Sequence, residues 1–228
     1  MTLINSADAV MVGATPAVAV YAGDVKVWPP APPAVPISFV KAISGSGIAG
    51  GTTSVTFTGH QKGDLLLAMG GNRVNTPFDT PSGWTLAKAQ GFTGNQQRSL
   101  TTCWKIAESA DPVTVTFSRS GAGDSSTPYS GGMVFRGARG VGATAGYAGS
   151  GAAGNTINFN GFTPQVTDGS SCMVVMTHLA APDGFTGAPS GWTLAGGFLY
   201  RLAQASMAAG TAPCNNIFNV SVSLELLD

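Results

Sequence analysis

One seven-residue segment, PSGWTLA, occurs at residues 81–87 and again, letter for letter, at residues 189–195. Chance repetition of a word of this length that contains tryptophan is very improbable, so the two copies indicate an internal duplication. Four further segment pairs follow the same order: SGSGIAGG (44–51) with AGSGAAGN (148–155), VTFTG (55–59) with INFNG (157–161), DLLLAMG (64–70) with CMVVMTH (172–178), and CWKIA (103–107) with LYRLA (199–203). The fold must therefore contain two related halves, which we place near residues 44–140 and 148–228.

Both halves consist of short apolar segments such as PISFVKAI, DLLLAMG and NVSVSLELL. Gly, Pro, Asn and Ser separate these segments at intervals of about 8–12 residues, which is typical of sandwiches and barrels. No segment shows sustained helical periodicity with capping residues. Because each half has too few strands to close a sandwich comfortably, we expect residues 37–228 to form one jelly-roll-like antiparallel β-sandwich with an internal pseudo-twofold repeat.

The N-terminal residues differ from this body. Residues 29–36 read PPAPPAVP, five prolines in eight, which is typical of a stiff polyproline II linker. Before the linker, residues 17–28 read AVAVYAGDVKVW, and the Gly23-Asp24 pair suits a two-residue hairpin turn. This turn would place Ala22 opposite Val25, Val20 opposite Val27 and Ala19 opposite Trp28.

An isolated apolar hairpin is at best marginally stable in water, so residues 1–28 need a surface to pack against. We expect them to anchor the chain to another protein; folding back onto the chain's own body is the alternative. The side chains expected to make the anchor are Val18, Val20, Tyr21, Val25, Val27 and Trp28.

The charge balance restricts the class of partner. Charged residues make up only 10% of the chain, and 11 basic and 11 acidic side chains cancel to a net charge of zero. Such a chain has little electrostatic protection against association, which suits a component of an assembly. No basic cluster is present to neutralise phosphates, so we expect no nucleic-acid partner. Residues 9–23 are uncharged but too short to span a bilayer, and no basic region precedes them; we expect neither a signal peptide nor membrane insertion.

Few residues have the types and spacings that catalysis or metal binding requires. The two GxGxxG matches, residues 45–50 and 149–154, precede strand-like rather than helical segments, so neither predicts a dinucleotide site. Cys103, Cys172 and Cys214 show no zinc spacing; the first two lie in apolar runs, where buried free thiols are expected. We therefore predict a non-enzymatic protein with no cofactor and no metal. Calcium at Asp79 or Asp183 stays open, although no dense ligand spacing supports it.

The remaining ionisable residues are sparse. His60 lies in the turn-like segment TGHQKGD, where we expect it to be solvated, and His178 ends a strand-like segment. Among the acids, only Asp64 and Glu225 touch strand-like segments, and a glycosidase needs two carboxyls on facing strands.

Recognition is expected in loops that a rigid scaffold holds in place. The segment 118–130, SRSGAGDSSTPYS, is the longest polar insertion, and the loops 71–80 and 179–188 precede the two PSGWTLA copies. The residues we select as recognition candidates are Arg73, Asn75, Asp124 and Tyr129. Trp84 and Trp192 could form sugar-stacking platforms, but their symmetric positions favour a structural role as plugs of the core.

The segment VYAGDVKVWP, preceded by a similar β-repeat, resembles the start of many tailed-phage minor tail and fibre proteins. The order GDLLLA, PSGWTL, CWKIA, VTVTF and GMVFRG also resembles β-sandwich domains of phage virion proteins. The resemblance implies a virion structural protein, assembled in the host cytoplasm, often homo-oligomeric, and bound to other virion proteins through its N-terminal segment.

On this basis we predict a minor tail or fibre component that displays the body for attachment to the host surface, with a surface glycan as one candidate receptor. A capsid decoration or head-fibre protein and a stand-alone carbohydrate-binding module are the alternatives, and a hydrolase ranks last.

Overall fold

The computed structural model describes residues 35–48, 51–92, 97–119, 128–149, 156–178, 185–214 and 220–228, together with four short strands between residues 11 and 28. The chain divides into two compact units, Met1–Ala34 and Val35–Asp228. Every strand pair is antiparallel. The prediction of an all-β protein is therefore confirmed. Among the described residues, no helix is long and apolar enough to cross a membrane.

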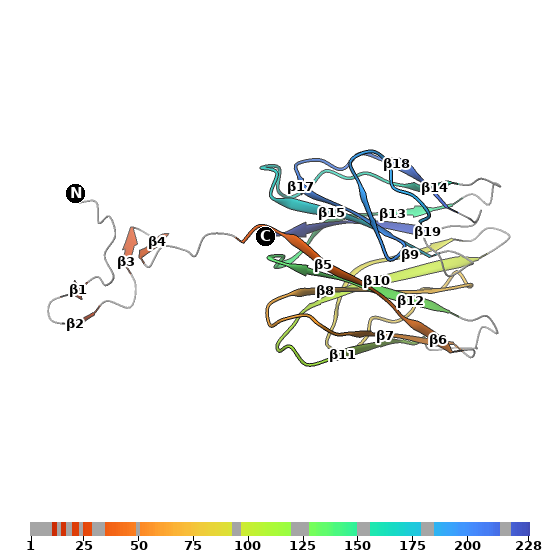
Figure 1. Ribbon diagram of the computed structural model, residues 1–228, viewed down its shortest axis with the longest axis horizontal. Helices are drawn as coiled ribbons and strands as arrows, with labels where there is room; N and C mark the ends of the chain where they lie inside the picture. The colour runs from red at the N-terminus through yellow and green to blue at the C-terminus, as the bar shows by residue number, and fades with distance from the viewer. Residues whose placement is uncertain are drawn as a thin grey trace. The chain divides into compact units, whose positions relative to one another are not determined.

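The N-terminal unit contains two strand pairs (Figure 1). Strand β1 (Met11–Val12) pairs with β2 (Thr15–Pro16), and β3 (Val20–Ala22) pairs with β4 (Val25–Trp28). Ala22 faces Val25, as predicted, but Val20 faces Trp28 instead of Val27. The register shifts between Val20 and Tyr21, because a bulge there adds one residue to one strand. The proposed anchor residue Val18 lies outside the described residues. Ala19, which was expected opposite Trp28, also lies outside them.

The first half of the body forms two sheets. Its strands are β5 (Ser38–Ser44), β6 (Ser46–Ile48), β7 (Thr52–Phe57), β8 (Leu65–Asn72), β9 (Thr85–Phe92), β10 (Arg98–Ile106), β11 (Val113–Phe117) and β12 (Tyr129–Arg136). Five of them form a sheet in the order β5-β12-β8-β10-β9, and the other three form a sheet in the order β11-β7-β6.

The second half repeats this plan. Its strands are β13 (Gly140–Ala148), β14 (Thr156–Phe159), β15 (Ser171–His178), β16 (Thr193–Ala195), β17 (Phe198–Gln204), β18 (Gly210–Pro213) and β19 (Val220–Leu227). The five-stranded sheet has the order β13-β19-β15-β17-β16, and β14 pairs with β18. With β6 set aside, each strand of one half has a counterpart at the same place in the other. The internal duplication is thus a feature of the fold as well as of the sequence.

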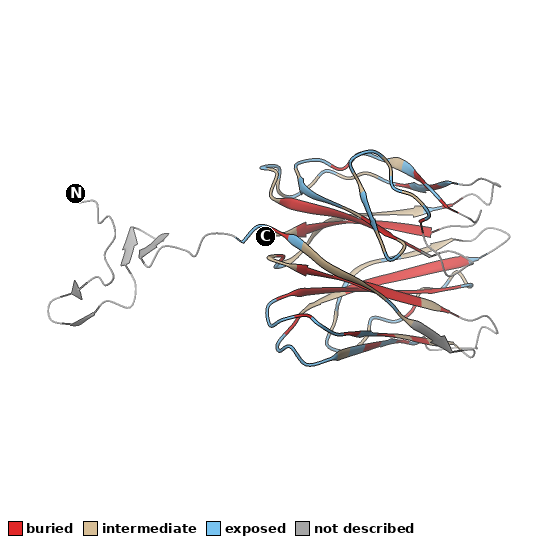
Figure 2. Ribbon diagram, in the orientation of Figure 1, coloured by how far each residue is buried: buried red, intermediate tan, exposed pale blue. Residues whose placement is uncertain are grey.

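The four sheets of the body stack in layers, as Figure 1 shows, and three apolar clusters lie between the layers. The central cluster lies between the two five-stranded sheets, and one outer cluster lies beneath each smaller sheet. On β8, Leu65, Leu67 and Met69 face the central cluster, while Leu66 and Ala68 face the outer one. Because successive strand residues point to opposite faces, a strand covered on both sides becomes a continuous apolar run. Figure 2 shows this burial along the middle strands of both large sheets.

The structure is consistent with the expected β-sandwich-like fold with an internal repeat. The premise that each half has too few strands to close a sandwich was wrong. Each half closes its own two-sheet unit, and the large sheets of the two units then pack on one another. Sequence reasoning did not identify β13, whose sequence GVGATAGYA is rich in Gly and Ala, β18, whose sequence GTAP ends in proline, or the short strand β6. The observed halves therefore span residues 38–136 and 140–227 rather than 44–140 and 148–228.

The alignment of DLLLAMG with residues 172–178 was also wrong, by one residue. Ala68 lies opposite Cys103, and Val175 lies opposite Leu199. Cys103 and Leu199 in turn lie opposite Leu86 and Leu194, which hold the same place in the two PSGWTLA copies. Ala68 is therefore equivalent to Val175, and residues 64–70 align with 171–177. The offset of 107 keeps equivalent residues on equivalent faces, since Leu66 and Met173 both face the outer cluster of their half, whereas a shift of one residue would exchange the two faces of the strand.

The repeated PSGW sequence forms the same turn twice. The Trp84 N–H donates to the Pro81 carbonyl oxygen at 3.1 Å, and the Trp192 N–H donates to that of Pro189 at 3.0 Å. Gly83 and Gly191 have φ values of +75° and +79°, a conformation that favours glycine.

Each tryptophan that follows the turn packs against a phenylalanine of its own outer cluster. The ring centroids are 5.8 Å apart for Trp84 and Phe57 and 5.5 Å apart for Trp192 and Phe159. Both tryptophans are half-buried and pack against the outer cluster of their own half, so each contributes to the structure there.

Candidate functional site

Three of the four recognition candidates lie at one end of the first five-stranded sheet. Strand β8 ends at Asn72, and Tyr129, which begins β12, lies opposite Gly71. We call this the distal end of the body. At the opposite, proximal end, Arg136 pairs with Ser38, three residues after Val35 begins the unit. Arg73 and Asn75 follow β8 at the distal end, whereas Asp124 lies outside the described residues.

The loop that carries Arg73 and Asn75 is held by a buried amide. Asn72 donates from Nδ2 to the Thr76 carbonyl oxygen at 3.2 Å, and its Oδ1 accepts from the Val74 N–H at 3.1 Å. The same Oδ1 accepts from the Ser99 hydroxyl at 2.7 Å. These hydrogen bonds close an Asx-type turn and leave Arg73 exposed. Tyr129 is half-buried and packs against the central cluster, so its ring contributes to the core as well as to the distal end.

At the proximal end, the two strand-associated acids have structural partners. Asp64 is 2% exposed and accepts two hydrogen bonds from Arg136, at 3.0 Å from Nε and 3.1 Å from Nη2, and a third from the Gln61 N–H at 2.8 Å. The hydrogen bond and the negative charge of Asp64 raise the pKa of Arg136. This bidentate pair fixes the β7–β8 connection to the end of β12.

Glu225 is fully buried in β19 and accepts four hydrogen bonds. Its Oε2 accepts from the backbone N–H groups of Ala143 (2.9 Å) and Gln165 (2.8 Å), and its Oε1 accepts from the Val166 N–H (3.0 Å) and the Ser171 hydroxyl (3.0 Å). Burial raises the pKa of this carboxyl, but the hydrogen bonds outweigh burial and the net pKa lies below the ordinary value. Glu225 therefore binds the 160–170 connection and β13 to the sheet.

The three cysteine thiols and the His60 imidazole are buried. His60 is 2% exposed, so the expectation that it is solvated was wrong, and neither ring nitrogen has a hydrogen-bond partner among the described residues. Cys103 and Cys172 are buried free thiols, which confirms the prediction for them, and Cys214 is buried as well. Burial raises the pKa of both thiols, and a buried thiol of high pKa is a poor nucleophile. Within the described ranges, no three His, Cys, Asp or Glu residues gather closely enough to hold a metal ion.

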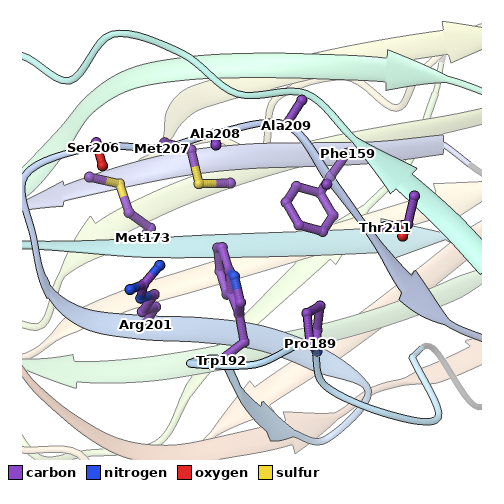
Figure 3. A pocket seen from close by; sticks show the side chains of 11 residues that line it. Phe159, Met173, Pro189, Trp192, Arg201, Ser206, Met207, Ala208, Ala209 and Thr211 are labelled. Atoms are coloured by element: carbon purple, nitrogen blue, oxygen red, sulfur yellow. The ribbon is translucent and has the colours of Figure 1, made fainter.

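A pocket of about 240 Å³ opens beside Trp192 on the outer face of the second half (Figure 3). Phe159 of β14 and Met173 of β15 line its buried part together with Met207, and Pro189 and Trp192 form a wall. Arg201 of β17 stands at the exposed side. Ser206, Ala208, Ala209, Gly210 and Thr211 complete the lining from the β17–β18 connection and β18.

Sequence reasoning singled out Trp192 but not Arg201. Arg201 could have been identified from the repeat, because the equivalent segments read CWKIAE at 103–108 and LYRLAQ at 199–204. The cation is retained in the second copy, as Arg201 in place of Lys105, while the acid Glu108 is replaced by Gln204.

No protein-family profile, curated protein or solved structure matches this chain.

Proposed function

We propose that the chain is a non-enzymatic bacteriophage virion protein, a minor tail or fibre component that is attached through residues 1–28 and displays the body for contact with the host surface. The observation that carries this proposal is the division of the chain into a small N-terminal unit of two short strand pairs and a separate compact body. A small sheet unit joined to a body through PPAPPAVP suits an anchor and a spacer. The resemblance of VYAGDVKVWP to tail and fibre proteins supports the same role.

The chemistry of the body supports display rather than catalysis. The buried carboxylates Asp64 and Glu225 each accept hydrogen bonds that hold neighbouring segments in place. The buried thiols have raised pKa values, which disfavours nucleophilic chemistry. A charged fraction of 10% with no net charge suits a surface that contacts other subunits, and we propose a homo-oligomer within the particle.

We further propose that each half is a jelly-roll variant. With β6 not counted, in both halves the first strand lies beside the last, the third lies between the last and the fifth, and the second pairs with the sixth. This arrangement matches a jelly roll that lacks one hairpin, with the fourth strand added at the edge of the large sheet. Jelly rolls occur in viral capsid and lectin domains, so the arrangement supports a display role by analogy of fold.

The body also offers a surface for host contact away from its attachment. Arg73, Asn75 and Tyr129 lie at the distal end, and the body continues from the linker at its proximal end. A spacer that joins the proximal end would leave the distal loops free to meet the host surface.

The proposal is tested by incorporation into particles. The full chain and a chain that lacks residues 1–34 are expressed during particle assembly, and particles are purified by density-gradient sedimentation. We expect the full chain to sediment with particles, and the truncated chain to stay in the unassembled fraction as a folded β-protein by circular dichroism. Incorporation of the truncated chain at the level of the full chain would contradict the anchor, and absence of both chains from particles would contradict the virion role.

A further inference from the structure

The two halves differ in the environment of one equivalent cation, which is Lys105 in the first half and Arg201 in the second. In the first half, Lys105 forms an ion pair with Glu108, with 3.2 Å between Nζ and Oε1. In the second half, the counterpart of Glu108 is Gln204, which turns away and donates from Nε2 to the carbonyl oxygens of Leu202 (2.6 Å) and Ala203 (2.9 Å). The Arg201 guanidinium is therefore left exposed, with no ion pair or hydrogen bond to any residue that the structure describes.

This unpaired guanidinium stands beside an aromatic wall. Arg201 lies over the PSGW turn, since a Cβ placed on Gly191 would be 3.5 Å from both its Cζ and its Nε. The next residue, Trp192, forms part of the pocket wall, and Figure 3 shows its indole between Arg201 and Phe159. Phe159 approaches the indole edge to face, at an interplanar angle of 62°. A planar cation and an aromatic surface thus line the same opening.

Small residues keep the opposite side of this opening clear. The β17–β18 connection contributes Ser206, Ala208 and Ala209 to this side. Hydroxyl groups at Ser206 and Thr211 add hydrogen-bonding capacity to a pocket whose buried part is formed by Phe159, Met173 and Met207. A volume of about 240 Å³ is below the range of pockets for drug-sized ligands, and it suits a single ring.

We propose that this pocket binds one pyranose ring that carries an anionic substituent, such as the carboxylate of an acidic sugar. The apolar face of the ring lies against Trp192, because an indole offers a large apolar face with a polar edge. The anionic group pairs with Arg201, whose planar fork matches a carboxylate or a phosphate with two parallel hydrogen bonds. This inference deepens the host-attachment role and rests on the function proposed above, since it assigns the receptor a chemical class.

The test uses the full chain and three probes of one ring size: D-glucuronate, D-glucose 6-phosphate and neutral D-glucose. Binding is followed by isothermal titration calorimetry and by the tryptophan fluorescence. We expect the anionic sugars to bind at least about tenfold more tightly than glucose, because only they can form a charge-assisted, bidentate pair with Arg201. The comparison of glucuronate with glucose 6-phosphate tells a carboxylate receptor from a phosphorylated one.

The repeat supplies matched control variants. Arg201→Gln should weaken binding of the preferred anionic sugar by about tenfold or more, while the equivalent Lys105→Gln in the other half should leave it unchanged. Trp192→Phe should weaken all three sugars, and Trp84→Phe none. Thermal unfolding of each variant checks its fold, and the exposed position of Arg201 keeps the test informative if Trp192→Phe unfolds.

Equal binding of glucose and the anionic sugars, equal effects of Arg201→Gln and Lys105→Gln, or no binding at roughly 10 mM sugar would each overturn the site. These results are separable from failure of the virion role. A chain that is incorporated into particles but binds no anionic sugar refutes the pocket alone. A chain that binds through Arg201 but is absent from particles refutes the virion role alone.

Discussion

Replacement of Glu225 by glutamine tests whether this buried carboxylate holds the second half together. The carboxylate accepts two hydrogen bonds on each oxygen, three of them from backbone N–H groups. If the amide oxygen of the variant takes the place of Oε2, the amide nitrogen faces the Val166 N–H, donor to donor. One buried N–H then loses its acceptor, which costs about 1–3 kcal/mol. The Ser171 hydroxyl then accepts from the amide nitrogen instead of donating, and the two bonds from Ala143 and Gln165 become neutral and roughly half as strong. Relief of the buried charge offsets part of this loss, so we expect about 3 kcal/mol of destabilisation.

Glu108→Gln is the matched control, because it makes the same chemical change at an exposed site. The Glu108 side chain is 84% exposed and, among the described residues, pairs only with Lys105, so its loss should cost less than about 0.5 kcal/mol. Urea denaturation followed by circular dichroism measures both variants, with the slope against urea unchanged if only the folded state is affected.

The effect of Glu225 should also depend on pH. Its pKa is lowered in the folded chain, so its stabilisation is fully present above the ordinary value of 4.5 and is lost as the pH falls through the folded pKa. The gap between the wild-type chain and Glu225→Gln should therefore be widest near neutral pH and should narrow below about pH 4. A gap that stays constant with pH, or a cost no larger than that of Glu108→Gln, would refute this reasoning.

Three further predictions concern the repeat and the core. Gly83→Ala and Gly191→Ala should each destabilise the chain by about 1 kcal/mol or more, because φ values of +75° and +79° strain an alanine. Gly140→Ala is the control and should have little effect on stability. A different order of the three variants in thermal unfolding would count against the shared turn. Leu67→Ala should lower the free energy of unfolding by about 2–5 kcal/mol, since Leu67 is fully buried in the central cluster. Leu86 is 47% exposed, so Leu86→Ala should cost less than about 1 kcal/mol. Similar costs for the two variants in urea denaturation would argue against tight packing between the halves. Cys103 and Cys172 should react with a thiol reagent such as DTNB only at the rate of unfolding, and rapid labelling of the native chain would contradict their burial.

The duplication was visible in the sequence because identical geometry needs identical residues at a few positions. A positive φ requires glycine at 83 and 191, and a large ring is needed over each outer cluster, so PSGWTLA was retained in both halves. Strands that are defined only by their partners were not visible. Strand β13 is rich in Gly and Ala and is a strand because it pairs with β19, which no local pattern predicts.

The candidate sites also divide into features that the sequence shows and contacts that form only in the folded chain. The donors to Glu225 come from residues 143, 165, 166 and 171, so the hydrogen-bonded cluster exists only once the chain has folded. The alternation of β8 and β15 could not decide between offsets of 107 and 108, since both strands are apolar on both faces. Arg201, by contrast, could have been found by comparing CWKIAE with LYRLAQ, because an unpaired cation is visible once the two copies are aligned.

The most direct measurement of the proposed role is immunogold labelling of particles purified from the lysate in which the chain is produced, with antibody raised against residues 37–228. We predict gold at the tail or its fibres, which would direct receptor studies to the distal loop and to the Trp192 pocket. Gold over the head would contradict the tail assignment and indicate a decoration or head-fibre protein. Particles without gold, from a lysate that contains the chain, would contradict the virion role itself.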